Sequence, residues 1–286
     1  MNSHQNVFRQ PRMLLSLLVI AFTTSAGIGQ TQQGTEASSA QSRIGADVGI
    51  VDFHQRDKYL SPDIFSGGMF TSRVSFFWSG EESRHAIEAV FSTGGMGPDV
   101  LHQDVKQYIG FLSYTYLRVL GRWEVNGSPL VFSAGGGLAS YVTDTDVREI
   151  DPGENVTTFE QSWYWSHALH IDLLGEYPLS TRDDITVHLS TPLVALVTRP
   201  HNGHWLNSSN LDVSKNFLNA ATNGRLEYLW DAFVLQAEVG FSHRMSDHVE
   251  LTGTYLFGYV SSNQPDPMLS LGTYANHFLL GIHWVL

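Results

Sequence analysis

The chain of 286 residues has no cysteine and few charged residues, and both shortages exclude classes of protein. Without cysteine it can be neither a disulfide scaffold nor a protein with a thiolate zinc site. Its 16 Lys and Arg against 28 Asp and Glu give a net charge of −12, whereas a nucleic-acid binder normally presents a basic face. Charged residues make up only 15% of the chain, which is low for a soluble domain of this size.

Long apolar runs are scarce as well, because the only one is Met13–Phe22. A bundle of transmembrane helices is therefore excluded. Arg9 and Arg12 precede the run and small or polar residues follow it, so residues 1–29 are predicted to be a secretory signal peptide. Its removal would change the net charge from −12 to −14, because it carries two arginines and no acidic residue. Residues 30–41 are polar and are expected to form a flexible periplasmic leader.

Aromatic residues are abundant, at 12%, and from residue 42 onward apolar and polar residues alternate with a period of two. In the last segment Phe278, Leu280, Ile282, Trp284 and Leu286 share one face, opposite His277 and His283. Strict alternation of this kind predicts a β-strand with one face in an apolar medium. Ten such segments are predicted, at residues 42–53, 67–79, 84–95, 106–120, 130–142, 161–176, 185–198, 229–245, 248–261 and 274–286.

Short and long connections alternate between these ten segments. The longer ones are 54–66, 96–105, 143–160, 199–228 and 262–273. A soluble sandwich has no reason to place all its short turns at one end, whereas a transmembrane barrel has short periplasmic turns, long extracellular loops and an even number of strands. Aromatic residues near the predicted strand ends, such as Phe76 and Trp78, fit the two headgroup levels of a membrane.

The signal peptide, the hairpins and the ending Phe278, Ile282, Trp284, Leu286 make residues 42–286 resemble bacterial outer-membrane β-barrel proteins of the porin-like class. The resemblance implies an all-β, antiparallel, up-and-down transmembrane barrel of about ten strands, with eight or twelve as alternatives. It also implies a bacterial outer-membrane location with periplasmic termini. The implied partners are outer-membrane lipid, lipopolysaccharide and, through the last strand, the barrel-assembly machinery. That machinery usually reads a terminal aromatic residue, and here the last residue is Leu286.

The polar face of each strand is then expected to line the lumen. Hairpin geometry sets Arg73 opposite Glu88 and Arg244 opposite Glu250, as pairs of opposite charge. Small residues on segment 130–142 could leave room for neighbours or for a narrow water path. The expected lumen residues are Asp47, Arg73, Glu88, Arg118, Ser133, Gly135, Gly137, Ala139, His170, Asp172, Glu176, His188, Gln236, Glu238, Arg244, Glu250, His277 and His283.

One group of polar residues suggests catalysis. The expected register puts Asp172 opposite His188 and His170 opposite Ser190, and these residue types can form an activated nucleophile. The patch only partly resembles the His-x-Ser-Asn stretch of lipid A deacylase barrels, and the loops lack the acidic and His–Asp arrangement of omptin proteases. Filling of the lumen by polar side chains is the competing interpretation.

A metal site has weaker support. His201 and His204 could supply two ligands from the longest loop, with Asp212 as a guessed third, but a solvated loop is the default interpretation. The acidic segment Asp144–Glu154 lacks the spacing of a calcium-binding EF-hand. No cofactor is expected.

The sequence therefore predicts a barrel with a structural or narrow-pore role, in which the charges of the lumen pair with one another. A lipid hydrolase acting on lipid A or phospholipid is the alternative that uses His170, Asp172, His188 and Ser190. A third alternative is an adhesin or assembly partner acting through loops 143–160 and 199–228. A soluble secreted binder is the fourth. The sequence does not fix the oligomeric state.

Overall fold

The computed structural model describes residues 41–58, 64–98, 103–150, 157–199, 225–228, 232–262 and 270–286, all within the unit Ala37–Leu286. The predicted signal peptide lies outside these residues, as does the predicted leader apart from Gln41, which begins the first strand. None of the described residues forms a helix that is long and apolar enough to cross a membrane.

The described residues form strands joined by turns. Their bounds are β1 Gln41–Asp57, β2 Phe65–Ser79, β3 Ser83–Pro98, β4 Gln103–Val125, β5 Ser128–Ile150, β6 Thr157–Pro178, β7 Asp183–Thr198, β8 Arg225–Tyr228, β9 Ala232–Ser246, β10 Val249–Ser262 and β11 Leu271–Val285.

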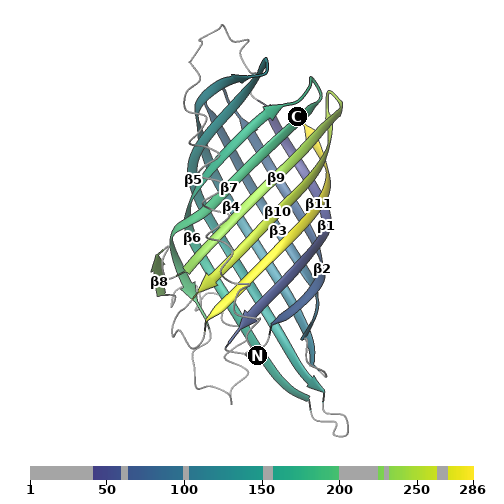
Figure 1. Cartoon of the computed structure of the whole chain (residues 1–286), viewed down its shortest axis with the longest axis vertical. Coiled ribbons are helices and arrows are strands. Elements are labelled where there is room, and N and C mark those ends of the chain that lie inside the picture. The colour runs from purple at the N-terminus through teal and green to yellow at the C-terminus, as the bar shows by residue number, and fades with distance from the viewer. Residues whose placement is uncertain are drawn as a thin grey trace. The chain divides into compact units, whose positions relative to one another are not determined.

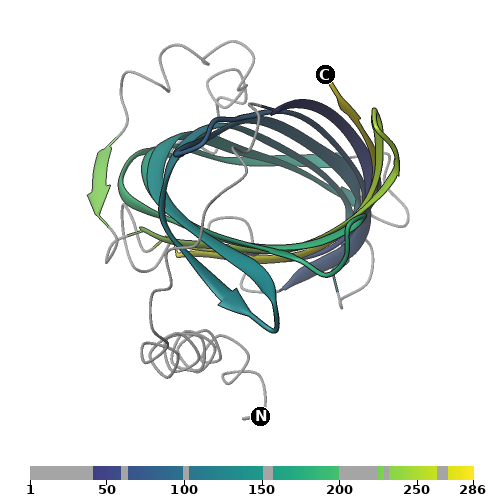
Figure 2. The same ribbon diagram turned by 90° about the horizontal axis from the view of Figure 1, so that it is seen from above.

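Ten of these strands close into an antiparallel barrel, as the alternation predicts (Figures 1 and 2). Strands β1 to β7 follow one another around the wall, β9 to β11 complete it, and β11 pairs with β1 from Arg43–Val285 to Asp57–Leu271. The short strand β8 is additional to these ten, and it pairs with residues 194–197 of β7. The prediction of an all-β barrel of about ten strands is therefore confirmed.

The two ends of the barrel differ in their connections. Residues 80–82, 126–127, 179–182 and 247–248 are short turns at one end, which we call the turn end. We call the opposite end the loop end. In the two-residue turn Asn126–Gly127 both residues have positive φ, 51° and 80°. This is the type of two-residue hairpin turn that an Asn-Gly sequence favours.

Short and longer connections alternate except between β3 and β4, where residues 99–102 are as few as those of the turn 179–182, and two loops were predicted too long. Most of 96–105 and of 143–160 belongs to strands, since β5 continues to Ile150 and β6 begins at Thr157. Strands β4 and β5 each have 23 residues, and residues 119–125 of β4 pair only with β5, so this hairpin extends beyond β3 at the turn end.

The outer face of the wall is apolar, as a lipid-facing band requires. Val48 and Leu280 are 56% and 72% exposed, whereas the inward neighbour Leu279 is only 2% exposed. Near the turn end, aromatic rings gather on the outside of β2 to β4, and His85 stacks on Trp78 at 4.5 Å between ring centroids. The rings of this cluster are Phe76, Trp78, His85, Tyr114 and Tyr116.

Candidate functional site in the barrel lumen

The lumen is where most polar side chains of the strands converge, as predicted. Asp47, Glu250 and His283 are each less than a tenth exposed although they lie in strands whose other face is apolar. The prediction that Arg118 lines the lumen is wrong. Its side chain is 68% exposed and pairs with Glu82 at 3.6 Å on the outside of the barrel. Its neighbour Leu117 is the buried, inward residue of β4. Both faces of this strand carry apolar side chains, so alternation alone did not orient it.

At the turn end the lumen is crossed by ion pairs. Arg244 lies directly opposite Glu250, with 3.2 Å between Nη2 and Oε1, so this predicted pair is confirmed. The same carboxylate accepts a hydrogen bond of 3.0 Å from Nη1 of Arg43 on β1. Arg84 of β3 reaches Glu176 of β6 at 3.1 Å, although these two strands are not neighbours in the wall.

Arg73 is the centre of the next layer. Its Nε donates to Oδ2 of Asp47, its Nη1 to Oε2 of Glu238 and its Nη2 to Oγ1 of Thr254, each at 3.0 Å. The Arg73 side chain is 4% exposed, and Oε1 of Glu88 lies 4.0 Å from its Nη1. One guanidinium group is therefore the cation for three carboxylates, from β1, β3 and β9. It lies in the barrel interior, where the effective dielectric constant is low.

The predicted register of the β2–β3 hairpin is wrong by two residues. Arg73 lies opposite Val90, and Glu88 lies opposite Ser75. The N–H of Gly80 donates to the carbonyl oxygen of Ser83, so the tight turn lies at 81–82, one position later than the predicted pairing assumed, and the whole ladder moves by two residues. The two charges still come together because both side chains point into the lumen and reach diagonally.

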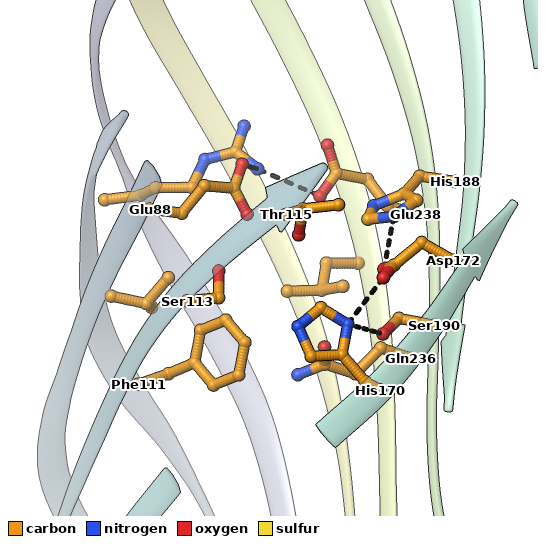
Figure 3. Close-up of a pocket in the computed structure, with 13 residues that line it drawn as sticks. Glu88, Phe111, Ser113, Thr115, His170, Asp172, His188, Ser190, Gln236 and Glu238 are labelled. Atoms are coloured by element: carbon orange, nitrogen blue, oxygen red, sulfur yellow. Dashed lines mark hydrogen bonds and ion pairs between the residues drawn. The ribbon is translucent and has the colours of Figure 1, made fainter. Parts of the chain in front are cut away.

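The suspected catalytic residues also come together, but in a different register from the predicted one. Asp172 lies opposite Ser190, and His188 lies opposite Leu174. The hairpin pairing starts at Pro178–Asp184, and a β-bulge lies between Leu169 and His170. In the resulting cluster, Nε2 of His188 lies 2.9 Å from Oδ1 of Asp172, and Nδ1 of His170 lies 2.6 Å from its Oδ2 (Figure 3).

The geometry of this cluster does not match a serine nucleophile with its base. Oγ of Ser190 lies 3.2 Å from Nδ1 of His170, the same nitrogen that faces Asp172. In a triad the carboxylate holds one ring nitrogen and the serine contacts the other, so that the ring can carry a proton between them. Here Nε2 of His170 has no hydrogen-bond partner within the described part of the chain. The arrangement therefore does not form that relay.

An apolar layer fills the lumen on the loop-end side of these residues. One cluster joins side chains of β1 to β5 and β11, among them Phe53 and Phe65, both fully buried. A second cluster joins β6, β7, β10 and β11 around Tyr164. Tyr141 packs against both clusters, so apolar contacts extend from one wall of the barrel to the other.

A polar layer closes the loop end beyond these apolar side chains. Nε2 of Gln55 on β1 donates to Oγ1 of Thr145 on β5 at 3.1 Å, and Thr145 in turn donates to Gln107 on β4. The carboxylate of Asp57 at the end of β1 accepts hydrogen bonds from Arg199 and Ser162 of the opposite wall, each at 2.7 Å. Sequence reasoning missed these contacts between β1 and the opposite wall, because it paired only neighbouring strands.

The metal-site residues His201, His204 and Asp212 lie outside the described residues. Within the described ranges no group of three or more His, Asp or Glu residues is arranged to hold a metal ion.

Comparison with known proteins finds structures with a similar fold, but it finds no relative by sequence. No protein-family model matches the chain, and no curated protein matches it. The outer membrane protease OmpT from Escherichia coli has a TM-score of 0.52 and 7% identity, covering 90% of this chain and 100% of that one. Neisserial surface protein A has a TM-score of 0.34 and 12% identity, covering 86% and 99%. Ail, the attachment invasion locus protein of Yersinia pestis, has a TM-score of 0.33 and 6% identity, covering 86% and 99%.

At these identities the likeness concerns the fold. The chain has the fold of outer-membrane β-barrel proteins, as the resemblance in its sequence implied, and no subfamily is indicated.

Proposed function

We propose that the chain is a structural barrel of the bacterial outer membrane whose lumen is closed to ions. The observation that carries this proposal is the series of contacts across the lumen, such as Arg73 with Glu238 and Gln55 with Thr145. They join strands that are not neighbours, so side chains occupy the space a pore would need. A ten-stranded barrel is little wider than its own side chains, which agrees with this filling. Of the structural and narrow-pore roles, the structural role has the better support.

Conductance of the purified full-length protein in planar lipid bilayers tests the closed lumen. We expect no steady channel events from the wild type. The triple variant Phe53→Ala, Phe65→Ala, Gln55→Ala should show brief openings, because it removes two fully buried rings of the apolar layer and the amide that joins β1 to β5. Phe70→Ala is the matched control on the outer face and should stay silent. Steady conductance of the wild type would contradict the proposal.

The orientation that we propose places the turn end and both termini in the periplasm and the loops outside. Short turns at one end and longer loops at the other support it. Because the chain has no cysteine, single cysteines report on this cleanly. A membrane-impermeant maleimide should label Lys58→Cys on intact cells, but Asp247→Cys only after the outer membrane is opened. The reverse pattern would refute the orientation, and a soluble periplasmic protein in cell fractions would refute the location.

The partners in this proposal are outer-membrane lipid and lipopolysaccharide around the apolar band, and the barrel-assembly machinery for the last strand. Trp284 on β11 and Leu286, which directly follows that strand, are 46% and 70% exposed. A cell depleted of the assembly machinery should accumulate the unfolded chain. Normal insertion of the barrel in such a cell would contradict the proposal that the assembly machinery is a partner.

The hydrolase alternative has less support, because Ser190 and Asp172 face the same nitrogen of His170 inside a closed lumen. We expect Ser190→Ala to leave the lipid A and phospholipid composition of the membrane unchanged. A changed lipid profile in cells carrying this variant, with normal amounts of folded barrel, would restore the enzymatic interpretation.

A further inference from the structure

A cavity lies in the lumen between the charged layer around Arg73 and the apolar layer. Its volume is about 80 Å³. Most of its wall is apolar, and Phe111, Tyr141 and Leu256 supply the larger side chains. Toward the turn end it adjoins the polar pocket of Figure 3, with which it shares Phe111, His170 and Gln236. The cavity thus has one polar end and one apolar end.

Small side chains keep this space open. Ala139, Ala168, Gly258 and Ala275 all line the cavity. At Gly258 an added β-carbon would make only an ordinary contact of 4.0 Å with Ala275, so the backbone does not demand glycine there. Protein interiors are normally packed without such voids, because the atoms lining a void lose their contacts. An open space in an otherwise filled lumen therefore calls for an explanation.

Two buried imidazole nitrogens border the same space without partners. His170 and His277 both line the cavity and are 6% and 7% exposed. Nε2 of His170 and Nδ1 of His277 make no hydrogen bond within the described residues. A buried polar group without a partner is unfavourable. A bound molecule with a hydroxyl or similar group could satisfy such a nitrogen, and so could water.

The barrel wall is interrupted beside this cavity. The β7–β9 ladder ends at Ser190–Gln236, and β7 pairs with β8 from Val194 onward. Pro192 lies in the interval and has no N–H to donate to a neighbouring strand. In its place, Oγ1 of Thr191 donates to the carbonyl oxygen of Val234 at 2.8 Å. Pro192 and Val234 also line the cavity, so its wall coincides with the point where two strands stop pairing.

We propose that this cavity is a binding site for a small, largely apolar molecule with one hydrogen-bonding group, such as a simple phenol. The apolar part lies among Phe111, Tyr141 and Leu256, and the polar group contacts the imidazoles of His170 and His277. The molecule enters from the membrane between β7 and β9, where side-chain contacts replace the backbone ladder. This role goes beyond that of a closed structural barrel and needs no continuous pore.

Binding of 4-bromophenol to the full chain refolded in detergent tests the site, with calorimetry for affinity and bromine anomalous scattering for position. Ala168→Leu fills the cavity and should weaken binding at least tenfold. Ala134→Leu is the matched control, because Ala134 pairs with the outward Arg118 and should leave binding unchanged. His277→Phe should reduce the preference for 4-bromophenol over bromobenzene at least fivefold while keeping an apolar ring in place.

Three results would overturn the site. The first is no binding to the wild type, which means that the cavity holds only water. The second is equal uptake by wild type, Ala168→Leu and Ala134→Leu, which indicates partition into the detergent. The third is a bromine position outside the lumen. Spectra and heat-induced unfolding of each variant show whether its barrel is folded.

Binding rates test the route of entry separately. A disulfide between Thr191→Cys and Leu235→Cys would join β7 to β9 at the next position of their ladder, with no native cysteine to compete. When it is oxidised, association and dissociation should both slow at least tenfold at unchanged affinity, and reduction should restore them. Pro192→Val, which restores an N–H, is the second variant and should slow both rates less. Unchanged rates in both variants would exclude this route.

Discussion

The two halves of the lumen are filled in different ways. Toward the turn end, arginines and carboxylates from separate strands bond one another, with Arg73 contacting Asp47, Glu88 and Glu238. Toward the loop end, apolar side chains such as Phe53 and Phe65 pack together, and amides, hydroxyls and the ion pair of Asp57 with Arg199 cover them. Both halves close the same barrel, so closure does not require one particular chemistry.

The difference lies in how each half responds to the loss of one side chain. A buried charge that loses its partner keeps the cost of its removal from water, so damage spreads to the groups that remain. An apolar layer that loses a side chain leaves a cavity, whose cost depends on how far its neighbours relax. The charged half should therefore be sensitive to the type of substitution, and the apolar half to its volume.

Removal of the central guanidinium should have the largest effect. Arg73→Met keeps much of the side-chain volume but leaves the carboxylates of Asp47, Glu88 and Glu238 without their cation. We expect a loss of about 3–5 kcal/mol in the free energy of unfolding, measured by urea titration in detergent.

The control for this variant is the same substitution on the outer surface. Arg118→Met removes an exposed pair with Glu82 and should cost at most about 1 kcal/mol. Equal losses in the two variants would show that the charged layer does not depend on pairing inside the lumen.

A cavity in the apolar half should cost somewhat less. Phe53→Ala removes a fully buried ring, and we expect a loss of about 3 kcal/mol in the same titration. Phe70→Ala, on the outer face and 55% exposed, is the control. It should cost clearly less, because detergent or lipid can fill the space that the ring leaves. A larger loss at Phe70 than at Phe53 would mean that the inner layer is not tightly packed.

The polar cover of the loop end should contribute less again. Thr145→Val removes the hydroxyl that accepts from Gln55 and donates to Gln107, leaving two buried amides short of a partner. We expect a loss of about 1–2 kcal/mol. If this variant is as stable as the wild type, the apolar layer alone closes that end.

The smallest effect should come from the tight turn at the other end. Gly127→Ala puts a β-carbon on a residue with φ of 80°, and we expect a loss of about 1 kcal/mol with little change in the lumen. Serine at the next position, Ser128, has no such requirement, so Ser128→Ala should be nearly neutral. A similar loss in both variants would show that the turn conformation is not the cause.

The sequence predicted the strands and the direction of most side chains, because an apolar medium on one side of a barrel forces a period of two. It failed for Arg118, where β4 carries large apolar residues on both faces. The pairing of Arg244 with Glu250 was predicted correctly, but the pairings of Arg73 and Asp172 were each displaced by two residues. The positions of the two turns set those registers, and a period of two carries no information about where a turn lies. The Asn126–Gly127 signal was present and could have fixed the β4–β5 turn.

Contacts across the lumen could not be predicted from hairpins. Arg73 and Glu238 lie 165 positions apart, and they meet only because the sheet curls until β11 reaches β1. The candidate catalytic residues were correctly predicted to lie close together. Their geometry was not, because it depends on which nitrogen of His170 faces Asp172, and that follows from side-chain packing.

The long pairing between β1 and β11 also sets the order in which this protein can be made. The barrel closes only when its final strand is available, so until the whole chain has been delivered it is at best an open sheet with two free edges. Such edges invite pairing with other chains, and contacts between the two ends of a sequence form slowly. The interval between synthesis and closure therefore exposes two strand edges, and a chain without its last strand would leave β1 without this partner.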